Sequence, residues 1–274
     1  MRQSIVRGFA PLFLLAAGTA GAAIVQHEGH VAPVHEALAK AVAAPTRTPA
    51  NLARDQYRHP AETLAFFGVK PSDTVVEIWP GGGWYTEILA PYVASGGGTL
   101  YTVASGRGLN GVNQMKQANP ALYGAVKTAD FPAMTAEAPR VPDDTADAVL
   151  TFRNVHNWQM GERPFAAEAF RQMFAMLKSG GTLGIVEHRL PESADSALER
   201  TSGYTKLSTV RRLAEEAGFR FVGTSEVNAN PKDKADHPGG VWSLPPTLQG
   251  GETDRDKYLA IGESDRMTVK FVKP

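Results

Sequence analysis

The chain of 274 residues carries 28 basic and 28 acidic side chains, so its formal net charge is zero. A neutral chain lacks the basic surface typical of nucleic-acid-binding proteins, and we expect no nucleic-acid partner. Cysteine is absent, which excludes disulfides, thiolate nucleophiles and cysteine-ligated metals. With 43% hydrophobic residues, the length suits one globular domain with extensions at its ends.

The N-terminus has the composition of a secretory signal. Arg2 and Arg7 flank the start of a short apolar run, Phe9 to Ala17, and Ala20-Gly21-Ala22 has the small-x-small pattern of a cleavage site. We therefore expect residues 1–22 to be a signal peptide and the protein to be periplasmic or secreted. The apolar run is short for a membrane span, so no stable membrane insertion is expected after cleavage. An uncleaved membrane anchor is the alternative.

Residues 23–48 are rich in Ala, Pro and His and are expected to form a flexible arm. Their histidines, His27, His30 and His35, have few acidic neighbours, so a solvated segment is favoured over a metal site. No metal is predicted anywhere in the chain. Residues 49–274 are expected to form the folded domain.

Strand-like and helical segments alternate through this domain. Helices are expected at 49–67 (split at Pro60), 84–94, 109–117, 164–177 (ended by Ser179-Gly180-Gly181) and 205–217. Apolar and β-branched runs predict strands at 74–79, 99–103, 123–128, 146–152, 182–187, 219–227 and 267–272. The alternation predicts an α/β fold with a parallel sheet. About forty residues without a convincing helix separate the last two strands, which suits an antiparallel addition at one edge.

The most informative segment is TVVEIWPGGGWY, residues 74–85. An apolar strand reaches Glu77 near its carboxyl end, Gly81, Gly82 and Gly83 follow, and a helix begins. Glycines allow close approach of the backbone, and bare N–H groups at a helix start can face a nucleotide-like ligand. A strand–helix turn without a ligand is the alternative, because glycines also serve ordinary turns.

This order of elements resembles the class I S-adenosylmethionine-dependent methyltransferases. More narrowly, the chain resembles a bacterial family of predicted, often exported, methyltransferases. The matching strings are 58–93, FRNVHNWQ (152–159), LKSGGTLGIVEHR (177–189), EEAGF (215–219), NPKD (230–233) and the ending from TDRDKYLA onward. The resemblance implies a Rossmann-like class I methyltransferase fold: a mostly parallel seven-stranded sheet with an antiparallel C-terminal strand and helices on both faces. It also implies S-adenosylmethionine as the cofactor.

The resemblance further implies where the cofactor binds. Its methionine part and ribose would lie over the glycine turn, its adenine beside the end of the third strand, and its methyl group near the end of the fourth. The residues implied are Glu77, Trp79, Gly81, Gly82, Gly83, Asp130, Phe131 and Asn154. Asp130 would hold the exocyclic amine of the adenine and Phe131 the face of its ring.

The chain departs from the family pattern at two positions. Trp79 stands where the first glycine of the motif is usual, and it can pack against a ligand or fill the crevice. Ala104 stands where an acid usually binds both ribose hydroxyls. A charge-assisted hydrogen bond contributes about 1.5–3 kcal/mol. Its loss weakens binding roughly ten- to hundred-fold, unless Ser105 or Arg107 compensates.

Methyl transfer needs an aligned acceptor and benefits from a base. His156 follows the fourth strand, between Asn154 and Asn157, and is the candidate base; a histidine that bonds only to loop backbone is the alternative. His188 and Arg189 end the fifth strand and could bind an acid group of the acceptor, or pair with Glu187 and the surface. The candidate catalytic residues are His156, Asn157 and His188.

Methyl transfer to an unidentified, small-molecule acceptor is therefore the first hypothesis for function. An exported, non-catalytic ligand-binding protein that retains the fold is the second, because the cofactor is made in the cytoplasm. A different reaction that uses His156, His188 and a recruited metal is the third. The sequence indicates neither the acceptor nor the oligomeric state.

Overall fold

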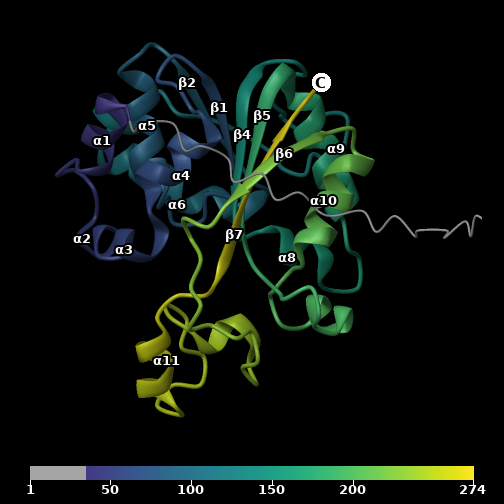
Figure 1. Cartoon of the computed structure of the whole chain (residues 1–274). Coiled ribbons are helices and arrows are strands. Elements are labelled where there is room, and N and C mark those ends of the chain that lie inside the picture. Colours follow the sequence, from purple (N-terminus) through teal and green to yellow (C-terminus); the bar gives the residue numbers. More distant parts are fainter. Residues whose placement is uncertain (1–34) are drawn as a thin grey trace, which may run out of the picture.

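In the computed structural model, residues 35–274 are described, and they surround one seven-stranded sheet of order β3-β2-β1-β4-β5-β7-β6 (Figure 1). The first five strands are parallel, and β7 is antiparallel to both β5 and β6. The strands are β1 (Thr74–Ile78), β2 (Thr99–Val103), β3 (Lys127–Ala129), β4 (Ala146–Phe152), β5 (Leu177–His188), β6 (Arg220–Ser225) and β7 (Arg266–Val272). The predicted fold class is confirmed.

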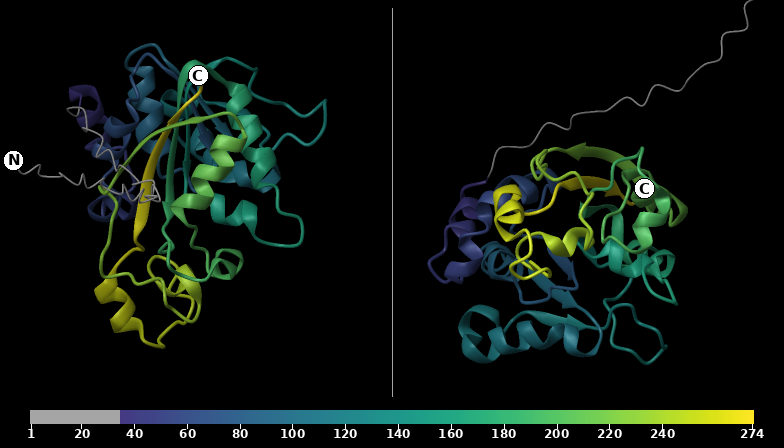
Figure 2. Two further views of the ribbon diagram at one scale, coloured as in Figure 1. Left: turned by 45° about the vertical axis from the view of Figure 1, so that its right-hand side comes forward. Right: turned by 90° about the horizontal axis from the view of Figure 1, so that it is seen from below.

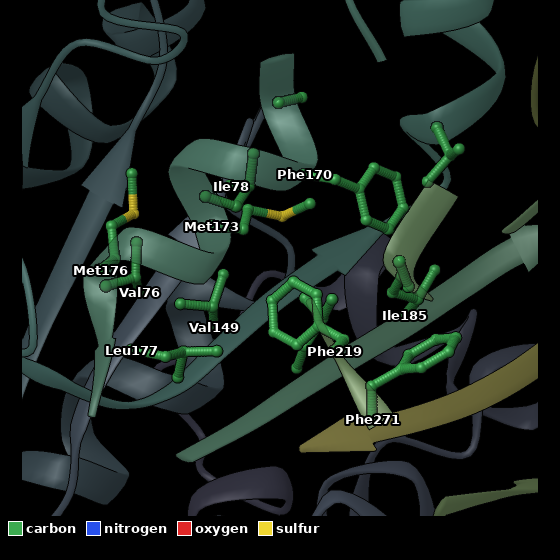
Figure 3. Close-up of a cluster of buried hydrophobic side chains, with 14 of the residues drawn as sticks. Val76, Ile78, Val149, Phe170, Met173, Met176, Leu177, Ile185, Phe219 and Phe271 are labelled. Atoms are coloured by element: carbon green, nitrogen blue, oxygen red, sulfur yellow. The ribbon is translucent and has the colours of Figure 1, made fainter. Parts of the chain in front are cut away.

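Helices cover both faces of the sheet because its central strands are apolar on both sides. One face packs against α1 (Glu36–Val42), α4 (Pro60–Phe67) and α5 (Thr86–Ala94). The other packs against α9 (Ala166–Met176) and α10 (Leu207–Glu216). Figure 3 shows this second core, where Phe170 and Met173 of α9 lie over Ile78 and Val149 of the sheet. These four side chains are fully buried.

The remaining helices are short: α2 (Pro49–Leu52), α3 (Asp55–Arg58), α6 (Asn110–Ala118), α7 (Pro120–Tyr123), α8 (Val155–Gln159) and α11 (Arg255–Ile261). The expected split at Pro60 is confirmed, since α4 begins there. The strand predicted at 123–128 is wrong in its first half. Pro120 stands at the start of α7, and the Asn119 side chain accepts a hydrogen bond from the Leu122 N–H. These local start signals override the strand pattern.

The expected helix end at Ser179-Gly180-Gly181 is also corrected. Helix α9 stops at Met176, and β5 begins at the next residue, Leu177. The three residues form an irregularity inside the strand, where the pairing with β4 shifts between Ala146 and Ala148. Gly180 has φ of +80°, the left-handed conformation that glycine adopts most readily.

The folded domain starts earlier than residue 49. Helix α1 lies within the segment expected to be a flexible arm, and Leu38 on it is 1% exposed. Arg47 is also buried and donates to both carboxylate oxygens of Asp55, at 2.6 and 2.8 Å. The C-terminal part of the expected arm is therefore packed on the domain. The predicted signal peptide, and the arm up to residue 34, lie outside the described residues.

The segment between β6 and β7 lies below the carboxyl ends of the parallel strands (Figure 1). It contains α11 and, in the view from below, lies beside the N-terminal helices (Figure 2). The functional side chains described next come from this edge of the sheet and from that segment. Among residues 35–274, no helix has the length and apolar character that a membrane span requires.

Replacing Leu38 by Ala tests whether α1 belongs to the domain. We expect L38A to lower the free energy of unfolding by about 2–4 kcal/mol, because it removes a buried side chain and leaves a cavity. Lys40→Ala, on the exposed face of the same helix, should change it by less than about 0.5 kcal/mol. Urea unfolding of both variants measures the difference. Equal, negligible effects would mean that the segment is a loose arm.

Candidate functional site

Two clefts lie at the carboxyl edge of the sheet, and Arg153 lines both of them. The glycine cleft, about 320 Å³, is lined by Asn51, Arg54, Arg58, Trp79, Pro80, Gly81, Gly82, Trp84, Phe152, Arg153 and Asn154. The histidine cleft, about 210 Å³, is lined by Arg153, His156, Asn157, His188, Val241, Trp242, Pro245, Pro246, Thr247 and Arg266. Both clefts combine polar side chains with aromatic or proline walls, as small-molecule sites do.

The glycine turn after β1 presents bare backbone to the glycine cleft. Gly81 and Gly82 are exposed, and their N–H groups have no main-chain acceptor within residues 35–274. A Cβ atom at either position would meet nothing within 4 Å. Gly83 differs, because it is buried and a Cβ there would collide with Met115 Sδ of α6. Gly81 and Gly82 are thus available to a ligand, whereas Gly83 has φ of +84°, a left-handed conformation that favours glycine.

Glu77 faces the start of α5 rather than either cleft. It is 2% exposed, and its Oε2 accepts a hydrogen bond of 2.6 Å from Thr86 Oγ1. Burial raises the pKa of the Glu77 carboxyl to about 7, although the Thr86 hydroxyl acts to lower it. The acid predicted to bind the cofactor therefore ties β1 to α5 and supports the glycine turn from behind.

Trp79 lines the glycine cleft and is held in place beside Phe131. Its Nε1 donates to the Phe131 carbonyl oxygen at 3.0 Å, and its ring packs against Trp158 and Phe165, with centroids 5.9 Å away. Ser105 Oγ donates to the same carbonyl at 3.0 Å. Trp79 holds this position with φ of 50°, which is unusual for a bulky residue.

The residues expected to contact the adenine line neither cleft. Phe131, expected to hold the face of the adenine ring, is fully buried, with its ring 5.8 Å from that of Trp158. Asp130 is partly exposed and lines neither cleft. Ala104 is buried, and Ser105, one of the two neighbours that could compensate for it, already donates to the Phe131 carbonyl oxygen. The residues present therefore fit the methionine half of the cofactor and, in this arrangement, not its adenosyl half.

Asn154 lies where β1 and β4 end side by side. Its amide nitrogen donates to the Ile78 carbonyl at 3.0 Å and to Thr151 Oγ1 at 3.2 Å. These bonds connect the ends of the two strands and place Asn154 on the wall of the glycine cleft. Asn154 was expected beside the cofactor, and it lines the cleft into which the glycine turn opens.

His156, at the start of α8, forms a buried pair with Glu187 at the end of β5. The Glu187 carboxylate lies 2.8 Å from His156 Nδ1 and also accepts from the backbone N–H groups of His156 and His188, at 3.3 and 2.8 Å. Glu187 is fully buried. The carboxylate therefore favours a proton on Nδ1, and the other ring nitrogen of His156 is left to act as a base in the histidine cleft.

His188 and Asn157 reach the same cleft in different ways. His188 Nδ1 lies 2.5 Å from Ser264 Oγ, and the ring lies 5.2 Å from that of His156. Burial, then the neighbouring His156 and Arg266, lower the pKa of His188 well below its usual range, so the ring is neutral at physiological pH. Asn157 is exposed at the mouth of the cleft. The three predicted catalytic residues are therefore brought together.

Arg189 does not join them. Its guanidinium pairs with Asp265 at 2.8 Å and with Glu226 at 2.8 Å, which is the surface role left open by the sequence. The NPKD string is structural as well: Asp233 accepts hydrogen bonds from the Tyr204 hydroxyl and from backbone N–H groups of Ala235 and Asp265.

One atom from each of His156, Glu187 and His188 could be brought within reach of a metal ion, since these atoms lie within 4.8 Å of one another. Glu187 is already used by three N–H donors. The guanidinium groups of Arg153 and Arg266 line the same cleft and oppose a cation. The arrangement therefore disfavours the recruited metal of the third hypothesis.

Sequence reasoning missed the basic residues of the two clefts: Arg54, Arg58, Arg153 and Arg266. Arg54 and Arg58 are four residues apart just before Pro60, and Arg153 lies within FRNVHNWQ. The positions of these arginines can be read from the sequence, but arginines at such spacing are also common on exposed helices. Nothing local marks these as lining a cleft.

Comparison with known proteins supports the fold. No family model and no curated protein matches the sequence. Many solved structures share the fold, among them an S-adenosylmethionine-dependent methyltransferase from Aquifex aeolicus, with TM-score 0.54, 16% identity, and 81% of this chain and 93% of that chain covered. The cyclase SpnF matches with TM-score 0.50 and 17% identity over 74% of this chain and 76% of its own. The chain thus has the class I methyltransferase fold, and the fold by itself does not decide the reaction.

Removing the buried charge at Glu77 should stabilise the protein in a pH-dependent way. A folded-state pKa of about 7, above the usual value of 4.5 for this side chain, means that ionisation of Glu77 destabilises the fold progressively as pH rises between those values. We expect Glu77→Gln to increase the free energy of unfolding by roughly 3 kcal/mol near pH 8 and by little near pH 5.

Urea unfolding at the two pH values measures this effect. Glu252→Gln, whose side chain is 92% exposed, is the matched control and should show no such difference. A Glu77→Gln variant that is less stable near pH 8 than the parent would contradict the burial argument.

Proposed function

We propose that this chain transfers a methyl group from S-adenosylmethionine to a small-molecule acceptor, with His156 as the general base. The observation that carries the proposal is the buried Glu187–His156 pair, which lies at the carboxyl edge of a class I methyltransferase sheet. A turn with two open glycines lies at the same edge, in the cleft that shares Arg153 with the histidine cleft.

The residues of the histidine cleft would prepare the acceptor. His156 Nε2 accepts the proton of an acceptor hydroxyl or amine, and Glu187 stabilises the imidazolium that forms. Glu187 is itself held by the two backbone N–H groups, so the imidazole is fixed before the acceptor binds. His188, neutral beside His156, adds no second positive charge next to that imidazolium.

The cofactor, when bound, supplies the reactive methyl group. Gly81 and Gly82 would hold its methionine part through their free N–H groups, and Asn154 would border it. On the adenosyl side, the Trp79 indole would have to leave its hydrogen bond to Phe131. We therefore expect weaker cofactor binding than in a site with glycine at this position and an acid in place of Ala104.

An exported, non-catalytic binding protein is the second candidate. The observations that favour it are the indole of Trp79 in the crevice, the burial of Phe131 and the loss of the ribose acid at Ala104. Export to the periplasm or beyond, as the leader at 1–22 predicts, is part of this candidate. Cell fractionation with sequencing of the mature N-terminus tests it.

Replacing Trp79 by Gly separates the two candidates. Glycine adopts φ of 50° without strain, and its substitution removes the indole from the crevice. If the first candidate is right, calorimetry should detect S-adenosylmethionine and S-adenosylhomocysteine binding to the parent, and at least about tenfold tighter binding to Trp79→Gly. Met134→Gly, at a side chain that is 71% exposed and lines neither cleft, is the control. Absence of binding by both the parent and Trp79→Gly at millimolar ligand would leave the second candidate.

The base assignment predicts a split between turnover and cofactor binding. His156→Gln should lower kcat by about 10²–10⁴-fold, the contribution of a positioned base, while cofactor affinity stays nearly constant. Release of S-adenosylhomocysteine, measured with a panel of small phenols, amines and acids as acceptors, provides the assay. His35→Gln, at the exposed N-cap position just before α1, is the control and should keep full activity. Parallel loss of cofactor binding and turnover would assign His156 a structural role.

A further inference from the structure

Four arginines meet around one carboxylate where the two clefts adjoin. Arg54 Nε donates to Glu263 Oε1 at 2.6 Å, Arg58 Nε donates to Oε2 at 3.0 Å, and Arg266 Nη2 donates to Oε2 as well. Glu263 is the ion-pair partner that these three share within residues 35–274. Arg153, the fourth, has no ion-pair partner in that part of the chain, although Glu263 and Arg266 both act on it. The cluster therefore holds three positive charges in excess.

The cluster also has unused donors in its buried interior. Arg58 is 3% exposed, and its Nη2 has no hydrogen-bond partner; Nη2 of Arg54 is buried and unpartnered in the same way. Both residues line the glycine cleft. The Arg58 guanidinium lies 4.8 Å from the centre of the Trp84 ring, which holds its plane in place. Buried N–H groups without acceptors are costly, so two residues that border the cleft and each carry an unsatisfied donor point to an acceptor supplied by a ligand.

The positive charges also oppose one another. Burial, and next the Arg153 guanidinium, lower the pKa of Arg58 to about 8. Burial and Arg266 lower the pKa of Arg153 to about 10. Although burial acts to raise it, Arg266, Arg58 and Arg54 lower the pKa of Glu263 to about 2, so the single acid of the cluster is fully ionised. An anion would relieve this repulsion, and a cation would increase it.

We propose that the acceptor carries an ionised acid group, a carboxylate or a phosphate, that binds between Arg58 and Arg153. In naming the acceptor, this inference rests on the function proposed above. The cofactor does not supply the missing charge, because its one carboxylate is accompanied by an ammonium and a sulfonium. Bidentate guanidinium groups match the geometry of a carboxylate or phosphate.

Arg153 connects this anion site to the base. It lines both clefts, with His156 and Asn157 on one side and Gly81 and Gly82 on the other. Its backbone N–H donates to the Val186 carbonyl at 2.6 Å, and it has φ of 63°, so the chain holds the residue at the junction of the clefts. An acid group bound to Arg153 leaves the rest of the acceptor free to reach His156.

Binding of inorganic phosphate tests the anion site without any cofactor. At constant ionic strength, millimolar phosphate should raise the melting temperature of the parent more than chloride does, and calorimetry should give a measurable Kd. Acetate should also bind, more weakly, because it carries a single charge. Arg153→Gln should weaken phosphate binding by roughly ten- to hundred-fold, and Arg153→Lys by less, since it keeps the charge and loses the fork.

A control and a stability measurement show that the variant is folded. Arg171→Gln, on the exposed side of α9 and outside both clefts, should bind phosphate as the parent does. Without phosphate, Arg153→Gln should melt at a temperature equal to or above that of the parent, because it removes an uncompensated charge. No phosphate binding by the parent, or equal binding by Arg153→Gln, would overturn the anion site.

The outcome also separates this inference from the proposed function. If phosphate binds at Arg153 and S-adenosylmethionine does not bind, the anion-site proposal is supported and the methyl-transfer proposal is contradicted. If methyl transfer is observed and Arg153→Gln raises KM for acidic acceptors with little change for neutral ones, both stand. Turnover that prefers neutral acceptors and is indifferent to Arg153→Gln would overturn the inference alone.

Discussion

A single buried carboxylate, Glu263, connects parts of the chain that are far apart in sequence. It accepts hydrogen bonds from Arg54 and Arg58, more than two hundred residues away at 209 and 205 positions, and from Arg266 at the start of β7. Through these bonds the segment between β6 and β7 is held against the N-terminal helices, beneath the carboxyl edge of the sheet (Figures 1 and 2). Loss of Glu263 would leave several buried guanidinium groups without their shared partner, so the walls of both clefts depend on it.

Two buried carboxylates at this edge have opposite surroundings. Glu187 is held by backbone N–H groups and the ring of His156, an environment that orients a base. Glu263 is outnumbered by guanidinium groups, an environment that attracts an anion. Because Arg153 lines both clefts, the proposed base and the proposed anion site adjoin each other. That combination narrows the acceptors worth testing to small molecules with an ionised acid.

The fold says less about the reaction than the side chains of the clefts do, because proteins with different reactions share this fold. The sheet order and the antiparallel β7 define the class I methyltransferase fold, which a cyclase also shares at TM-score 0.50. Two positions depart from the pattern that the resemblance implies for binding an adenosyl group: Trp79 stands in place of a glycine, and Ala104 stands in place of an acid. Binding of the cofactor therefore depends on the side chains at positions 79 and 104. The chemistry of the clefts is the better guide to function.

The sequence by itself determined the elements that depend on local patterns. The apolar run of β1, the glycine turn and the alternation of strands and helices are local, and they predicted the sheet and the place of His156. The strand expected at 123–128 failed where Asn119 and Pro120 start a helix instead. Only the tertiary structure decided what the arginines do. Arg58 and Glu263 meet because the sheet and the segment before β7 bring these distant residues together. No periodic pattern in the sequence indicates a pairing between charges that are so far apart along the chain.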